Sequence, residues 1–535
     1  MTAPPAPPPS AWSPLRRSLF RGLWIADVAS NIGTWMHDSA AAWLMTSLAP
    51  SPLMVSLVQA ATTLPLFLLA LPAGALADIF DRRRILLIAQ VWWFLTTVLL
   101  GVLTITGVIQ PWMLLVITLA IGVGSAVDLP AWQSIIPETV PREELPAAVG
   151  LGSIAINIAR AIGPAVAGLI IVAGGPGPVF FINAVSVLGV FFVLWRWRRE
   201  PTRAVLPAER LVSAMRAGVR YVRHAPALRN VIVRTPAFVG FASALWALLP
   251  VVVRTSLGRG AVSYGALVGS LGLGGLIGAA LLPTWRKRWS TDAITAAATA
   301  LFALGCAALA WVSNFGVLAA AMVIAGAGWL TTLSSLLLAA QRGAAGWVRG
   351  RALAISTLTL FGSLAIGAVV WGVVADRMGV QWALTAAAGG IVLGLALVPR
   401  FRLAAAEALD LEPSHNWADP VVAEELADDA GPVLVMVEYT VEPAQRAAFA
   451  ATARSLLRPI RRRDGAVFWE LFLDAANPRR CVEYWLVESW AEHLRQHERT
   501  TRADRELQVR VRAFTVGHER TTHFVALSRT GESSD

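Results

Sequence analysis

Four polar residues recur at helical spacing in the first apolar stretch of the chain. Asp27, Asn31, Thr34 and Asp38 lie at positions i, i+4, i+7 and i+11. At about 100° per residue and about 1.5 Å rise, they fall within about 60° of one another along a stripe about 16 Å long. Ionisable side chains on one face of an apolar helix are typical of ion or substrate pathways. We therefore expect proton coupling or substrate passage along this stripe, with Asp27, Asn31 and Asp38 as its main residues.

Two further charged residues lie inside apolar stretches. Arg160 lies about 20 Å along the fifth stretch by its helical rise, between the expected depths of Asp27 and Asp38, so that it could pair with either aspartate. Asp128 lies in the fourth stretch beside Pro130, nearer the cytoplasmic end. A charge at mid-bilayer costs roughly 2.5–3.5 kcal/mol, so these residues join the predicted pathway. The alternative is that Asp27 and Asp38 lie in the headgroup zones and are simply hydrated.

The composition is that of an integral membrane protein. Of its 535 residues, 56% are hydrophobic and 15% are charged, whereas soluble domains carry about 25% charged residues. The net charge of +11 is better explained by the retention of basic loops in the cytosol than by nucleic-acid binding. With two cysteines, Cys306 and Cys481, a disulfide framework is not expected.

Apolar runs long enough to cross a bilayer, about 20 residues each, recur along the chain. Twelve are predicted, at 20–48, 53–77, 85–107, 111–135, 147–173, 178–197, 232–253, 260–283, 291–312, 315–340, 352–375 and 381–399. Basic residues concentrate in alternate loops, such as 82–84 and 286–288. By the positive-inside rule, both termini are then cytoplasmic.

The basic turn after the second run carries a recognisable motif. Gly74, Asp78, Arg82 and Arg83 fall in register with G-x-x-x-D-R-x-G-R-R, whereas Ile79 and Asp81 depart from it. The stretch resembles the major facilitator superfamily, in which this loop latches two six-helix halves on the cytoplasmic face. The resemblance implies a latch role for these four matching residues. A plain topogenic charge cluster is the alternative.

The fifth run carries a second resemblance to this superfamily. Residues 159–168, A-R-A-I-G-P-A-V-A-G, are similar to the antiporter motif of its exporters, with matches at Gly163, Pro164 and Gly168. Small residues permit close helix approach and proline bends the helix, so a generic packing face is the alternative. Residues 15–400 resemble the enterobactin-exporter-like branch. The resemblance implies alternating access and proton-coupled export of a siderophore, drug or metabolite-like molecule from a bacterial cytoplasmic membrane.

The polar C-terminal region alternates strand and helix patterns in the order βαββαβ, which is the ferredoxin-like pattern. It resembles antibiotic-biosynthesis-monooxygenase-like modules that form dimeric α+β barrels, which leaves a homodimer open. His493 and His497 are four residues apart and could share a metal, yet spacing reveals no third ligand. No metal or cofactor is therefore predicted. Trp469, Tyr484 and Trp485 are expected to pack within strands.

Together these patterns predict an all-α membrane protein of twelve transmembrane helices in two six-helix bundles, with a small α+β ferredoxin-like domain. The expected segments are a disordered tail 1–19, bundles 20–197 and 232–399, linkers 198–231 and 400–432, and the domain 433–530. The expected partners are a small-molecule substrate, protons and the lipid bilayer. The chain is predicted to be a transporter and not an enzyme; the alternative is a membrane-tethered enzyme or sensor that acts through the C-terminal module.

Overall fold

The computed structural model describes residues 10–198, 211–406, 409–414, 417, 420, 422–423 and 426–526. The chain divides into two compact units. The first contains the long helices of residues 1–206, 233–336 and 357–401, and the second contains 207–232, 337–356 and 402–535. Each unit is described by itself.

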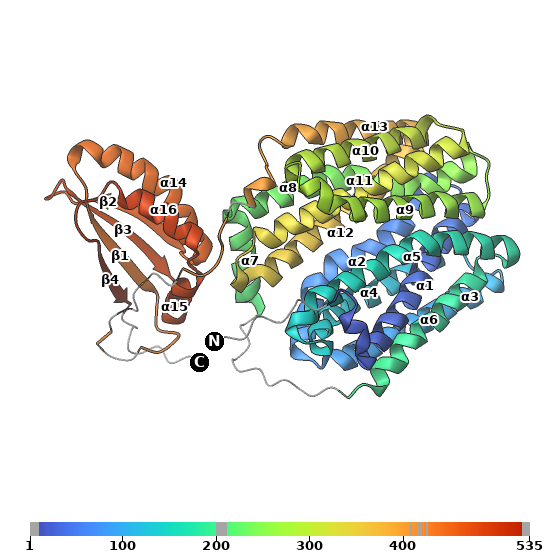
Figure 1. Ribbon diagram of the computed structural model, residues 1–535, viewed down its shortest axis with the longest axis horizontal. Coiled ribbons are helices and arrows are strands. Elements are labelled where there is room, and N and C mark those ends of the chain that lie inside the picture. The colour runs from blue at the N-terminus through green and yellow to red at the C-terminus, as the bar shows by residue number, and fades with distance from the viewer. Residues whose placement is uncertain are drawn as a thin grey trace. The chain divides into compact units, whose positions relative to one another are not determined.

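Six long helices precede residue 198 (Figure 1). They are α1 (Ser18–Leu48), α2 (Pro52–Ile79), α3 (Arg82–Ile105), α4 (Pro111–Thr139), α5 (Leu145–Gly174) and α6 (Gly177–Arg196). Prolines in the first turn start α2 and α4, where a missing N–H costs little. The side chain of Asp81 caps α3 by accepting a hydrogen bond from the Arg84 N–H at 2.9 Å. Helix α1, which carries the polar stripe, packs against α5 and α6.

Six more long helices follow the linker helix. They are α8 (Pro226–Val251), extended by a π-helical turn over Val252–Ser256, α9 (Ala261–Arg286), α10 (Thr291–Trp311), α11 (Phe315–Arg342), α12 (Arg349–Met378) and α13 (Val380–Gly394). Helix α10 packs against α13 and α9 against α5. Their core is apolar and aromatic, and Leu245, Leu267 and Phe302 are fully buried in it.

A helix occupies each of the twelve predicted apolar runs. Within the described residues, eleven of these helices are long and apolar enough to cross a membrane. Helix α1 is 31 residues long but is not among the eleven. Its stripe of polar residues lowers its hydropathy, so its membrane crossing stays a prediction.

The C-terminal region forms a four-stranded antiparallel sheet with helices. Its elements are β1 (Val433–Thr440), α14 (Arg446–Asp464), β2 (Phe468–Leu473), β3 (Arg480–Val487), α15 (Trp490–Arg499), α16 (Arg502–Arg512) and β4 (Arg520–Val525), with strand order β2-β3-β1-β4. Residues of β1 and β3 alternate between buried and half-buried positions, so one face of the sheet packs on the helices. The second helix of the predicted βαββαβ order is divided in the structure into α15 and α16. The division occurs because Thr501 and Asp504 form a capping box that starts α16.

A buried carboxylate joins the sheet to α14. Glu483 is fully buried on β3 and accepts hydrogen bonds from the Tyr439 hydroxyl at 2.8 Å, the Trp469 indole at 2.8 Å and the Arg461 Nε at 3.0 Å. The Arg461 guanidinium also lies 4.2 Å from the Trp485 ring centroid. A buried ion pair of this kind is costly to break from one side, because the partner charge stays buried.

We expect Glu483→Ala to destabilise the C-terminal sheet by about 3–5 kcal/mol, because Arg461 loses its counter-charge. Hydrogen–deuterium exchange of the full chain in detergent should then accelerate about a hundredfold or more in peptides from β1 and β3. Glu470→Ala is the matched control, since Glu470 is half exposed and pairs with Arg454 at 3.6 Å. Unchanged protection in Glu483→Ala would contradict this assignment.

Candidate functional site

The polar stripe of α1 is held together by local hydrogen bonds. The Asn31 amide donates to the Asp27 carboxylate at 2.9 Å and to the Asp27 backbone carbonyl at 2.9 Å. The Thr34 hydroxyl donates to the Ser30 carbonyl at 3.0 Å. Asp38, one turn beyond Thr34, lies within electrostatic reach of Tyr264 on α9. The stripe therefore runs from the interior of the first six helices to the boundary with the second six.

A second carboxylate approaches Asp27 from α4. Asp128 accepts a hydrogen bond at 3.1 Å from the amide of Gln90, a buried residue of α3. Asp27 and Asp128 are close enough to repel each other electrostatically. Two neighbouring carboxylates cannot both hold a full charge at low cost. Gln90 was not predicted, although a glutamine inside an apolar run was a usable signal.

Arg160 does not pair with Asp27 in this structure, contrary to the pairing considered from the sequence. Its guanidinium carbon lies 5.0 Å from the ring centroid of Trp35, a cation–π contact. Its Nε and Nη1 atoms are buried without a hydrogen-bond partner among the described residues. A buried guanidinium with unused N–H donors can bind a carboxylate or another oxygen anion, which accepts these hydrogen bonds.

Aromatic rings continue from Trp35 into the second set of helices. Trp35 lies 6.3 Å from Trp246 on α8, and Trp246 lies 5.5 Å from Trp329 on α11, between ring centroids. The Trp246 indole N–H is buried without a hydrogen-bond partner among the described residues. Phe238 and Phe302 extend the cluster beyond Trp329. A guanidinium at one end of an aromatic surface can orient an amphipathic molecule.

Helix α5 meets α9 at glycines that leave no room for a side chain. A Cβ on Gly168 would lie 2.7 Å from the Ala261 carbonyl oxygen, and one on Gly272 would lie 2.6 Å from the Ala161 Cα. A Cβ on Gly265 would also clash with the carbonyl oxygen of Pro164. A Cβ on Gly163 would lie 2.8 Å from the Cβ of Trp35 on α1. The antiporter-like segment is thus the contact between the two sets of helices, through glycines of α9 that were not predicted.

Polar contacts join the two sets of helices where α1 ends and α2 begins. Arg254, just after α8, donates from Nη1 to the Thr46 hydroxyl at 3.0 Å and to the Ser47 hydroxyl at 2.5 Å. The Ser51 hydroxyl donates to the Asp376 carboxylate, near the end of α12, at 2.8 Å. The same end also holds the stacked rings of Trp43 and Tyr264, whose centroids are 5.8 Å apart.

The basic motif after α2 makes contacts inside the first six helices. Arg82 pairs with Glu138 of α4 at 2.9 Å, and Arg83 donates to the Leu194 and Trp195 carbonyls at the end of α6, both at 2.7 Å. The side chain of Asp78 lies outside the described residues. At Gly74 no atom of the described residues lies within 4 Å of an added Cβ. The latch role of this motif remains a prediction.

His37 is a buried residue that sequence reasoning missed. It lies on α1 with 2% of its surface exposed, and both ring nitrogens lack a hydrogen-bond partner among the described residues. The centroid of its ring lies 4.9 Å from that of the Phe180 ring. His37 follows Thr34 by one helical turn and adds a titratable group beside the stripe. Its presence in an apolar run was the sequence signal that could have identified it.

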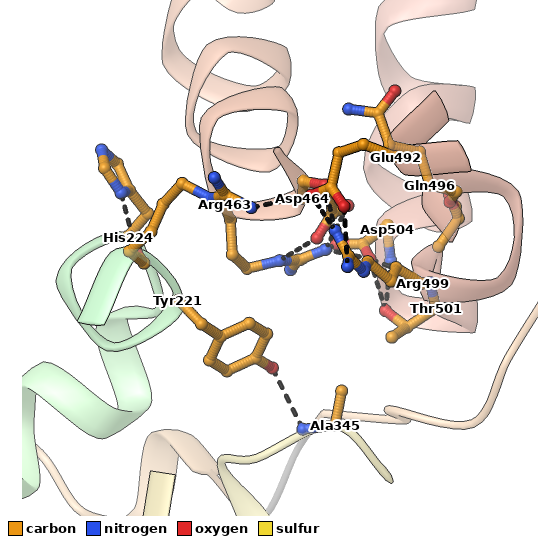
Figure 2. A network of polar contacts seen from close by, with 12 residues as sticks. Tyr221, His224, Ala345, Arg463, Asp464, Glu492, Gln496, Arg499, Thr501 and Asp504 are labelled. Atoms are coloured by element: carbon orange, nitrogen blue, oxygen red, sulfur yellow. Dashed lines mark hydrogen bonds and ion pairs between the residues drawn. The ribbon is translucent and has the colours of Figure 1, made fainter. Parts of the chain in front are cut away.

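In the second unit, the linker helix α7 (Leu211–His224) binds the C-terminal domain through the polar network drawn in Figure 2. Arg220 pairs with Glu492 of α15 at 3.0 Å, and Arg499 pairs with the same carboxylate at 2.6 Å. The buried Tyr221 hydroxyl accepts a hydrogen bond from the Ala345 N–H at 3.1 Å, in the segment between α11 and α12. One helix of the C-terminal domain thereby contacts the linker between the two sets of long helices.

Within the same network, Arg463 bridges two acidic side chains. It donates to Asp464 at 2.8 Å and to Asp504 at 2.7 Å, and Figure 2 shows these groups beside Tyr221. Burial alone would raise the pKa of Glu492, but the hydrogen bond and charge of Arg499 hold it below its usual range. The pair of Glu492 with Arg220 therefore contributes at neutral pH and is lost as the pH falls through this lowered pKa.

Comparison with known proteins places this geometry in context. A family model described as transmembrane secretion effector (MFS_3) matches residues 9–531. The chain is 25% identical over 253 residues to the staphyloferrin A transporter of Staphylococcus aureus (strain NCTC 8325 / PS 47), covering 47% of this chain and 64% of that protein. It is 29% identical over 229 residues to the uncharacterized MFS-type transporter YfiS of Bacillus subtilis (strain 168), covering 40% and 53%. The matched stretch thus spans less than two thirds of either relative.

A longer match is to the multidrug efflux pump Tap of Mycobacterium tuberculosis (strain ATCC 25618 / H37Rv), at 26% identity over 408 residues, which covers 71% of this chain and 92% of that protein. Among solved structures, a bacterial homologue of the iron transporter ferroportin in an inward-facing state has a TM-score of 0.57 at 15% identity, covering 72% of this chain and 98% of that one. A bacterial homologue of the lysosomal transporter Spinster, also inward-facing, has a TM-score of 0.55 at 15% identity, covering 73% and 96%. These two structures support the fold alone.

Proposed function

Because the chain belongs to the MFS_3 family of major facilitator transporters, described as transmembrane secretion effectors, we propose that it exports a small molecule in exchange for protons. The observation that carries this proposal is the pair of neighbouring carboxylates, Asp27 and Asp128, inside the first six helices. Buried groups of this kind are retained where an ion moves. The names of the family and of the relatives are those of transporters, not of enzymes.

The transport mechanism in this proposal is alternating access between two six-helix bundles. Helix α1 is the twelfth span and packs against α5 and α6. Both termini are cytoplasmic, in a bacterial cytoplasmic membrane, because the basic loops fall on that side. The contacts of Arg254 with Thr46 and of Ser51 with Asp376 then close the outer end. Access to the interior in this state is from the cytosol.

The proposed cargo is an amphipathic molecule that carries an oxygen anion or another strong acceptor. Trp35, Trp246 and Trp329 offer it an apolar and aromatic surface, and Arg160 offers unused N–H donors. Such a cargo fits relatives that include a siderophore transporter and a multidrug efflux pump. Within the superfamily, we assign the chain to the enterobactin-exporter-like branch.

The test is an accumulation screen in cells that express the chain and in cells with empty vector. The panel contains a catecholate siderophore, a carboxylate siderophore, a macrolide and a fluorescent amphipathic dye. Expression should lower the accumulation of at least one compound, and a protonophore should restore it. The proposal fails if no compound leaves faster, or if efflux persists unchanged when the pH gradient is collapsed.

A second candidate role belongs to the C-terminal domain, for which the contact between α7 and α15 is the supporting observation. Its strand order β2-β3-β1-β4 suits a ferredoxin-like domain of the antibiotic-biosynthesis-monooxygenase-like kind, which can also pair into a homodimer. We propose that it regulates transport through α7, since this helix lies in the linker between the two bundles. The structure offers Arg220 and Glu492 as the direct contact.

A double-mutant cycle tests this regulatory role. We expect Arg220→Ala and Glu492→Ala to show a coupling of about 0.5–3 kcal/mol, because the pair is largely shielded from solvent. The readouts are exchange protection of α7 and the transport rate of the full chain. Arg223→Ala, an exposed position on the same helix, is the control. If α7 loses exchange protection in both single variants but the transport rate is unchanged, the contact has only a structural role. That result would overturn the proposed regulatory role.

A further inference from the structure

The C-terminal domain encloses a cavity that the transport proposal does not use. It has a volume of about 580 Å³ and is lined by residues of the sheet and of α14, α15 and α16. Three histidines share its wall, namely His493 and His497 from α15 and His523 from β4. The sequence left the first two without a third ligand, and the fold supplies it.

The three imidazoles are spaced as metal ligands are. The Nε2 atoms of His493 and His497 lie 3.4 Å apart, and one ring nitrogen from each of the three histidines lies within 4.8 Å of the others. Ligand nitrogens at about 2.0–2.1 Å from a tetrahedral ion lie about 3.3 Å apart. The ring nitrogens of His493 and His497 already have about this separation. A ring nitrogen of His523 would have to move toward them by at most about 1.5 Å.

The fold brings these residues together for identifiable reasons. Ser489 caps α15 by accepting a hydrogen bond from the Glu492 N–H at 3.3 Å, which fixes where the helix begins. His493 and His497 are one turn apart on it and share a face. His523 lies opposite Val435 in the pairing of β4 with β1. The ring of Trp490 lies 5.4 Å from that of His493, and the ring of Trp417 lies 5.0 Å from that of His497, so both rings shield the cluster.

A cationic side chain faces the same cavity from α14. Arg461 is 5% exposed, and its Nε is taken by Glu483, but its Nη1 is buried without a hydrogen-bond partner among the described residues. An unused guanidinium N–H beside a cluster of imidazoles is suited to an oxygen anion. The cavity thus offers both a set of metal ligands and a donor for an anionic ligand.

We propose that His493, His497 and His523 bind one divalent transition-metal ion, with a further coordination position open to the cavity for an anionic oxygen ligand near Arg461. Imidazole ligands suit zinc, copper, iron and nickel, and three histidines leave a tetrahedral ion one free position. Helix α15 also carries Glu492, which contacts α7. The helix that supplies two of the proposed metal ligands is therefore the same helix that contacts the linker helix α7.

The test uses the full chain in detergent after removal of any affinity tag. Titration with Zn²⁺ should give one site per chain, and the Co²⁺ form should show the intense visible bands of tetrahedral coordination. We expect His493→Gln and His523→Gln each to weaken Zn²⁺ binding at least about tenfold, whereas His518→Gln, an exposed histidine in the same domain, should not. Exchange protection of β1 and β3 in each variant shows that the domain stays folded.

Two results would overturn the assignment of the three histidines as metal ligands. One is the absence of stoichiometric Zn²⁺ binding to the wild-type chain, in which case His493 and His497 form a hydrogen-bonded pair. The other is binding that survives in His493→Gln and in His523→Gln. Acetate added to the Co²⁺ form should shift the visible bands; unchanged bands would refute the open coordination position.

Discussion

Asp27→Asn is expected to abolish efflux driven by a pH gradient while leaving the fold intact. The asparagine keeps the size of the side chain and its hydrogen bond with Asn31, but it cannot take up or release the driving proton. Exchange of internal for external substrate should persist, because that process moves no net proton. Everted membrane vesicles with an imposed pH gradient measure the first process, and proteoliposomes with substrate on both sides measure the second.

The control for this substitution is Asp410→Asn. Asp410 is about half exposed, outside the long helices, and pairs with Arg502 at 3.4 Å. It should leave both processes unchanged. Asp38→Asn is made in parallel, since Asp38 is the second aspartate of the polar stripe. If both Asp27→Asn and Asp38→Asn retain proton-driven efflux, the proton-coupling assignment is wrong.

Gly272→Ala is expected to reduce transport strongly by separating α5 from α9. The added methyl group would lie 2.6 Å from the Ala161 Cα and 2.7 Å from the Arg160 carbonyl oxygen. Backbone atoms cannot move aside as a flexible side chain can, so we expect an overpacking cost of about 1–3 kcal/mol. If the cost falls on the conformation with α5 and α9 in contact, its population drops about 5- to 150-fold.

The matched control is Gly389→Ala on α13, an exposed position where an added Cβ would lie more than 4 Å from every atom in the described part of the chain. Initial transport rates in proteoliposomes and the melting temperature in detergent are compared for both variants. Gly272→Ala should lower the transport rate, and Gly389→Ala should lower neither quantity. Equal rates in the two variants would mean that the contact of α5 with α9 is not part of the transport cycle.

Local patterns in the sequence predicted the helices and the polar stripe. Apolar runs indicated where each long helix lies, and the spacing of Asp27, Asn31 and Thr34 placed them on one face, as their hydrogen bonds in the structure reflect. The order of strands and helices in the C-terminal domain also followed from alternation. These features depend on neighbours within a few residues, which a single sequence records directly.

Features set by packing between distant segments were not predictable. The expected depths of Arg160 and Asp27 in the membrane allowed them to pair, but in the structure the guanidinium of Arg160 lies over the Trp35 ring instead. Gly272 and Gln90 matter only because other helices bring Ala161 and Asp128 to them. His523 joins His493 and His497 because β4 pairs with β1, a pairing between segments far apart in sequence.

The most direct test of proton-coupled export is a measurement of proton movement during transport. Purified chain is reconstituted into proteoliposomes with a pH-sensitive dye inside, and an outward gradient is imposed of the compound that the accumulation screen identifies. The account predicts that outward movement of the compound acidifies the lumen in the wild type and not in Asp27→Asn. Outward movement at the same rate with an unchanged lumenal pH would contradict it.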